Sequence, residues 1–139
     1  MGLFNGIKNT YKKSEAAVVV QNLLEHQASF GLFDHDPARF ANQLVQRAWD
    51  SKPDIFAGKF GQRPHKLSTA AIALALGYRL MSESDRNRDA LLISLGIILA
   101  DLKKNAMLYP FNGVDEHLLE RAVAVYQEAA EELGVEESA

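Results

Sequence analysis

Apolar positions are densest in residues 67–102, where two almost uninterrupted hydrophobic segments flank the charged run 84–89. Segments of this length without alternating polar positions favour buried helices over strands. The charged run between them is typical of an exposed turn. We therefore expect a central antiparallel helical hairpin, with arms at about residues 67–82 and 85–106.

Small residues recur within both arms of this predicted hairpin. Ala73 and Gly77 lie four positions apart in the first arm, as do Gly96 and Ala100 in the second. Pairing 77 with 96 and 73 with 100 gives a common midpoint inside the charged run. The spacing predicts that the two helix backbones approach closely through these four residues.

The N-terminal segment has two apolar stripes that do not line up. The apolar side chains of residues 1–13 share one helical face, and those of residues 16–30 lie on roughly the opposite side. Since one straight helix cannot direct both stripes toward the same core, we expect a break within residues 9–14. The main helix would then end at Gly31.

Capping residues predict the limits of the remaining helices. Asp36 followed by Pro37 is a typical helix start, and this helix should end before Pro53. Residues 52–66 form one long irregular connection with room for a short helical turn. The last helix is expected at about residues 115–133.

Serines are the expected caps of the hairpin arms. Ser68 or a neighbour would begin the first arm, and Ser82 or Ser84 the second. Arg79 interrupts the first arm and is expected to pair with Glu83 one turn later. On the last helix, seven apolar residues are expected to point inward: Leu118, Leu119, Ala122, Val123, Tyr126, Ala130 and Leu133.

The 139 residues show no alternating strand pattern and no internal repeat. We therefore predict an all-α, single-domain bundle of about five to six helices around the central hairpin. Residues 1–13 would form an N-terminal amphipathic arm, residues 14–134 the helical domain, and residues 135–139 an acidic C-terminal tail.

Charge and composition narrow the function classes. The net charge is only −3, with basic residues in excess before Leu67 and acidic residues in excess after it. This charge balance lacks the strong basic excess of nucleic-acid-binding proteins, and the separation of basic and acidic halves suits attraction between subunits.

The chain contains no cysteine, which excludes disulfides and thiol chemistry. Without a signal-peptide pattern or an apolar run of about 20 residues, we expect a cytoplasmic protein.

The connection at residues 52–66 is the best candidate for a binding site, because it is rich in cations and leads into a helix N-terminus. Free backbone N–H groups and nearby cations together favour an anion. The predicted anion-binding residues are Lys59, Arg63, His65, Lys66, Ser68 and Thr69. The alternative is a solvated basic loop in which Phe56 and Phe60 only fill the core.

Other chemistry finds little support in the sequence. The histidines are scattered over four segments with no metal-binding spacing, and no nucleophile motif is present. We therefore predict no catalytic residue, no metal site and no cofactor, and no motif names a family.

Three functional hypotheses follow from these patterns. The first is a non-catalytic helical protein-interaction module that self-associates or binds another protein. The second is a small-ligand or anion-binding protein, or an enzyme, that uses the basic loop at residues 52–69. The third is peripheral membrane association through residues 1–13, with apolar side chains inserted and lysines near the headgroups.

Overall fold

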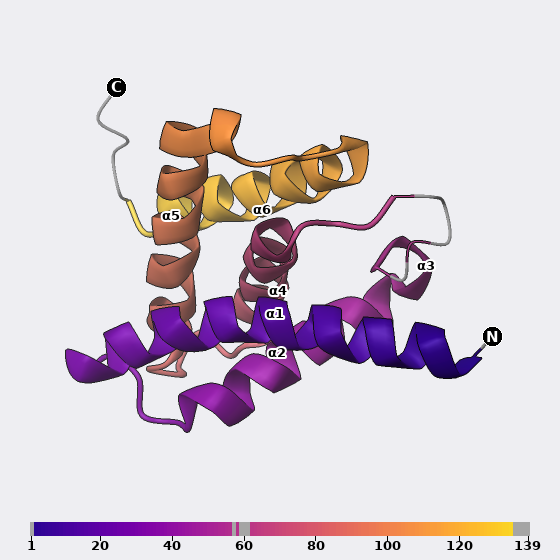
Figure 1. Ribbon diagram of the computed structural model, residues 1–139. Helices are drawn as coiled ribbons and strands as arrows, with labels where there is room; N and C mark the ends of the chain where they lie inside the picture. Colours follow the sequence, from indigo (N-terminus) through magenta and orange to yellow (C-terminus); the bar gives the residue numbers. More distant parts are fainter. Residues whose placement is uncertain (1, 57, 59–61, 135–139) are drawn as a thin grey trace.

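The computed structural model describes residues 2–56, 58 and 62–134, and within them every regular element is a helix (Figure 1). The elements are α1 (Gly2–Ser29), α2 (Pro37–Ser51), α3 (Pro53–Phe56), α4 (Lys66–Leu80), α5 (Arg88–Asn105), the short 3₁₀ helix η1 (Ala106–Leu108) and α6 (Gly113–Glu132). The predicted all-α fold is confirmed. None of these helices combines the length and the hydrophobicity that crossing a bilayer requires, as far as the described residues extend.

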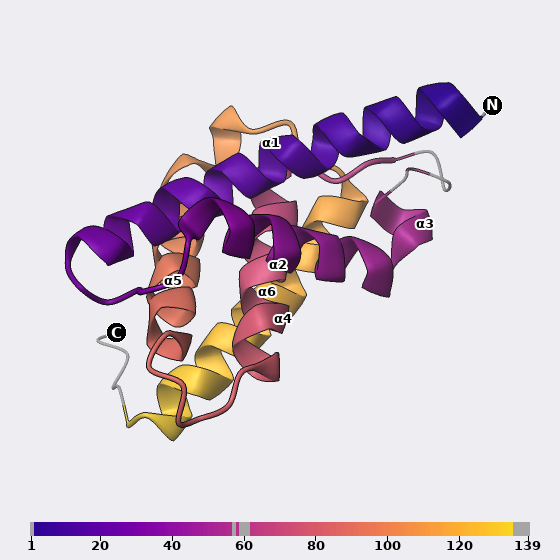
Figure 2. The same cartoon turned by 90° about the horizontal axis from the view of Figure 1, so that it is seen from below.

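The helices form two antiparallel pairs and a closing helix. Figures 1 and 2 show α1 and α2 side by side, and α4 and α5 as a second pair joined by a short loop. Helix α6 packs mainly on α4, on the side away from α2 (Figure 1). Because α4 contacts α1, α2, α5 and α6, it is the centre of the bundle. The predicted central hairpin is therefore confirmed.

The composition of α4 explains its central place. Its residues from Ser68 to Ala75 are all buried, and half of them are alanines. Small side chains let neighbouring helices approach from every side without strain, and together they remove a large apolar area from water.

The predicted pairing of small residues between the hairpin arms is wrong. A Cβ atom on Gly77 would lie 2.5 Å from Cδ2 of Leu44 in α2 and 3.0 Å from Cδ2 of Leu91 in α5. A Cβ atom on Gly96 would instead meet the ring of Tyr126 in α6, and Ala100 is exposed. The two glycines thus accommodate large side chains of different neighbours rather than each other.

The predicted break in the first helix is also wrong, because α1 is continuous over 28 residues. It ends at Ser29, and Gly31 follows with a φ of +74°, a conformation that suits glycine at a helix end. The N-terminal part of α1 projects beyond the body of the bundle (Figures 1 and 2), and Tyr11 is 65% exposed. Since Tyr11 does not face the core, its side chain does not require a break, and the side chains of residues 1–9 lie outside those that are described.

The ends of α2 are as predicted. The Asp36 side chain accepts a hydrogen bond from the backbone N–H of Ala38, and Pro37 is the first helical residue. The helix ends at Ser51, before Pro53.

The predicted serine cap of the second hairpin arm is wrong. Helix α5 begins at Arg88, beyond Ser82 and Ser84, whose hydroxyls bond to each other at 2.9 Å. In the same loop the buried Asn87 exchanges two hydrogen bonds with Asp34 of the α1–α2 loop, at 2.9 and 2.7 Å. This side chain therefore joins the two helical pairs.

Arg79 does not pair with Glu83 as expected, but with Glu128 of α6. Both side chains are more than half exposed, so this ion pair adds little to stability. It nevertheless shows that α6 crosses α4 within reach of its last turn.

Candidate functional site

Five of the predicted anion-binding residues, Arg63, His65, Lys66, Ser68 and Thr69, lie at the start of α4, and His65 caps this helix. Its Nδ1 atom accepts a hydrogen bond of 3.1 Å from the backbone N–H of Leu67. The imidazole therefore already satisfies one of the free N–H groups that an anion would bind.

Ser68 and Thr69 point into the protein rather than toward a ligand. Both are buried, and their hydroxyls lie 3.0 and 3.1 Å from the backbone carbonyl oxygen of His65. The Ser68 hydroxyl also contacts the carboxylate of Asp115.

Asp115 is the residue that organises this region, and it is only 1% exposed. Its carboxylate accepts hydrogen bonds from the backbone N–H groups of His65, at 2.6 Å, and Asn112, at 2.9 Å. Asn112 caps α6 and also donates from its side chain to the carbonyl oxygen of Arg63, at 2.9 Å. These contacts tie the start of α4 to the start of α6. We call His65, Ser68, Asn112 and Asp115 the Asp115 junction.

The His65 ring lies beside the rings of Tyr109 and Phe111, with centroids 5.8 and 5.4 Å away. Burial lowers the pKa of His65 below its usual 6.5, against an opposing attraction from Asp115. The neutral imidazole is the form that can accept the Leu67 hydrogen bond. Burial and capping thus favour the same protonation state.

Serine, histidine and aspartate meet here, but not in the order of a hydrolase triad. The Ser68 hydroxyl contacts the carboxylate instead of the imidazole, and Nδ1 of His65 is already used in the helix cap. Ser68 is also completely buried, so no substrate can reach it. The junction is a structural contact.

The two remaining cations of the predicted site that are described, Arg63 and Lys66, lie beside this junction. Lys66 is exposed, and Arg63 is half-buried with its side chain against Gly58. Lys59 and Phe60 lie outside the described residues, while Phe56 is buried and stacks on Trp49 at 5.2 Å. The anion site remains a prediction, which within the described residues now depends on Arg63 and Lys66.

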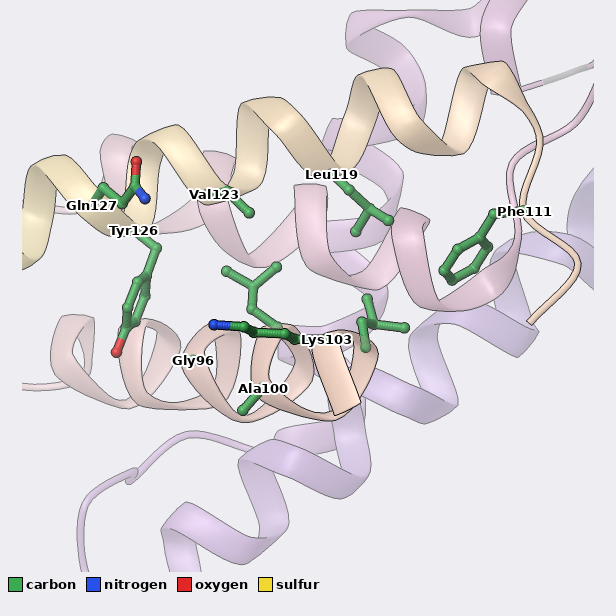
Figure 3. Close-up of a pocket in the computed structure, with 10 residues that line it drawn as sticks. Gly96, Ala100, Lys103, Phe111, Leu119, Val123, Tyr126 and Gln127 are labelled. Carbon is green, nitrogen blue, oxygen red and sulfur yellow. The ribbon is translucent and has the colours of Figure 1, made fainter. Parts of the chain in front are cut away.

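A larger feature lies between α5 and α6, where the two helices enclose an apolar groove of about 530 Å³ (Figure 3). We call it the α5–α6 groove. It is lined by Gly96, Leu99, Ala100, Leu102, Lys103, Phe111, Leu119, Val123, Tyr126 and Gln127. Figure 3 shows Tyr126 over Gly96 at one end and Leu119 near Phe111 at the other, so the helices run in opposite directions.

The groove exists because only one side of the apolar surface of α6 packs against the core. Leu118, Ala122 and Val125 are buried there, whereas Leu119, Val123 and Tyr126 are only half-buried. Of the seven residues expected to point inward, Leu118, Ala122 and Ala130 are buried, and Leu133 is 56% exposed.

The surface of the groove extends beyond its lining residues on both helices. On α5, Ile93 and Ile97 are 42% and 41% exposed and lie on the same side as Ala100. On α6, Glu116 and Glu120 flank a second hollow that shares Leu119 and Val123 with the groove. This surface was not predicted, although the apolar stripe of the last helix is wide enough to indicate it.

No metal site is found in the described part of the chain, where no three His, Asp or Glu side chains come together in a way that could hold an ion.

Comparisons with known proteins name no relative. No protein-family model matches the chain, and neither a curated protein nor a solved structure is significantly similar to it.

Proposed function

We propose that this protein is a non-catalytic, cytoplasmic interaction module that self-associates through the α5–α6 groove. The observation that carries the proposal is the uncovered apolar surface formed by Leu119, Val123 and Tyr126 on one wall and Leu99 on the other. Each Å² of such surface that a partner covers contributes roughly 25 cal/mol. Large exposed apolar patches with polar rims are characteristic of protein interaction sites.

The shape of this surface favours a protein over a small ligand. The groove is open to solvent, and its apolar character continues onto Ile93 and Ile97 beyond the α5 rim. Small-molecule pockets usually enclose most of their ligand. A ligand in the groove would leave these isoleucines in water, whereas a second helical surface would cover them.

Sedimentation velocity over a hundredfold range of concentration tests the proposal. We expect a dimer that dissociates on dilution. The variants Ala100→Glu and Val123→Glu, which put a charge into the groove from each wall, should be monomeric. Val18→Glu is the matched control, because Val18 is 53% exposed on α1 and lies away from the groove.

Two outcomes would overturn the proposal. One is a wild-type protein that stays monomeric at the highest concentration. The other is a dimer that both groove variants leave intact, provided their circular dichroism spectra match that of the wild type. Ala100 is already exposed, so a charge there does not require refolding of the core.

A further inference from the structure

The charges beside the α5–α6 groove differ between its two walls. Lys103 and Lys104 occupy the last turns of α5, and Glu116 and Glu120 the first turns of α6. Because the helices run in opposite directions, these two charged segments lie toward the same end of the groove (Figure 3). Within the described residues, no ion pair engages any of these four side chains.

Two orientations of a twofold axis can bring the groove of one copy onto the groove of another. An axis across the groove places α5 on α5 and α6 on α6. An axis along the groove places α5 of each copy over α6 of the other and keeps every residue at its own level.

Charge distinguishes these orientations. The axis across the groove opposes two copies of α6, whose exposed surface carries Glu116, Glu120 and Glu131. The axis along the groove brings the lysines of one copy over the glutamates of the other, twice in each dimer. It also places Ile93 and Ile97 against the apolar surface of α6.

Building on the proposed function, we infer that the partner is a second copy of this chain, related by a twofold axis along the groove. Lys103 and Lys104 of each copy then lie over Glu116 and Glu120 of the other. The dimer is a four-helix layer made of two α5 and two α6 helices. Its apolar contacts supply most of the affinity, and the four lysine–glutamate contacts select the orientation.

Charge exchange tests this arrangement. The lysine variant carries Lys103→Glu and Lys104→Glu, the glutamate variant carries Glu116→Lys and Glu120→Lys, and the exchanged variant carries all four changes. Each two-residue variant should raise the dimer dissociation constant by about tenfold or more, because like charges then meet across the interface. The exchanged variant should return to within about threefold of the wild type, because opposite charges face each other again.

The control for net charge is Arg39→Glu with Arg47→Glu, two exposed positions on α2. It makes the protein as acidic as the lysine variant and should leave the dissociation constant nearly unchanged. Raising the salt concentration should weaken the wild-type dimer and this control to the same extent, because both keep the lysine–glutamate contacts.

The outcomes separate this inference from the proposed function. A wild-type monomer overturns both. A wild-type dimer that the lysine and glutamate variants do not weaken overturns the orientation alone, because an axis across the groove does not place these lysines over these glutamates. Failure of the exchanged variant to recover also overturns the orientation, while the groove variants still report on the function.

Discussion

The Asp115 junction gives the most direct quantitative test of the fold, through the substitution Asp115→Asn. The new side chain has the same shape, so it leaves no cavity. It keeps one carbonyl oxygen but replaces the second carboxylate oxygen with an amide NH₂, which cannot accept a hydrogen bond. The N–H groups of His65 and Asn112 bond to different carboxylate oxygens, so one of them loses its acceptor.

The magnitude follows from these contacts. The Ser68 hydroxyl can still donate to the carbonyl oxygen of His65, so it loses little. A buried N–H group left without an acceptor costs about 1–3 kcal/mol, and the remaining hydrogen bond loses the extra strength of a charged acceptor. We therefore expect Asp115→Asn to lower the free energy of unfolding by roughly 3 kcal/mol.

Urea unfolding followed by circular dichroism at pH 7 measures this loss. A single dilute protein concentration keeps self-association from adding to the stability. Glu116→Gln is the matched control, since it removes the same charge from the same helix end but is exposed, and should cost about 0.3–1 kcal/mol. If the two variants are equally stable, the buried hydrogen bonds of Asp115 do not support the fold as described.

Three further predictions concern other parts of the bundle. Gly77→Ala should destabilise the protein by about 1–2 kcal/mol, because its Cβ would lie 2.5 Å from a buried leucine methyl. Gly96→Ala should change the stability by no more than about 0.5 kcal/mol, because the half-buried Tyr126 ring that it meets can move. Thermal unfolding measures which variant is less stable, and a less stable Gly96→Ala would contradict the packing. Neutral His65 caps α4 and its folded pKa lies below 6.5, so its contribution to stability is complete above about pH 6.5 and declines as the pH falls toward the folded pKa. His65→Asn caps the helix without titrating, so the change in urea midpoint between neutral and mildly acidic pH should be smaller in this variant. An unchanged pH dependence would refute the capping role. Asn87→Ala should expose the Asp34 amide to faster hydrogen exchange, measured by NMR, because the Asn87 side chain accepts its hydrogen bond; an unaltered exchange rate would count against the link between the two loops.

The hairpin of α4 and α5 could be predicted because its signal is local. A long apolar run, a charged turn and a second apolar run suffice to identify two buried helices. The partner of each small residue is not local. Gly77 accommodates Leu44, which precedes it by more than thirty positions, and nothing in the spacing within the hairpin could indicate this.

The missed continuity of α1 has a different physical cause. The predicted break assumed that every apolar side chain must face the core, yet Tyr11 is largely exposed. A helix can extend past the body to which it is anchored, since its backbone hydrogen bonds are internal. The part from Ala16 onward, with Val20 and Leu24 fully buried, is held by the core.

The candidate anion site illustrates how a sequence can locate a region without its chemistry. The predicted helix start directly after the basic loop is observed, since α4 begins at Lys66. Asp115, about fifty residues away, supplies the negative charge that the nearby N–H groups require. This acidic partner could not be foreseen, because the approach of α6 to α4 depends on the whole bundle.

The width of the apolar stripe on α6 connects the fold to the proposed function. A helix packed on one neighbour needs only a narrow apolar stripe, whereas this helix has hydrophobic residues at two adjacent positions in each turn. The positions of Leu118 and Ala122 pack on the core, and those of Leu119 and Val123 line the groove. Because α4 and α5 cannot cover both sides, the second side remains available for another copy of the chain. The same feature that made the inward stripe difficult to predict therefore supports self-association.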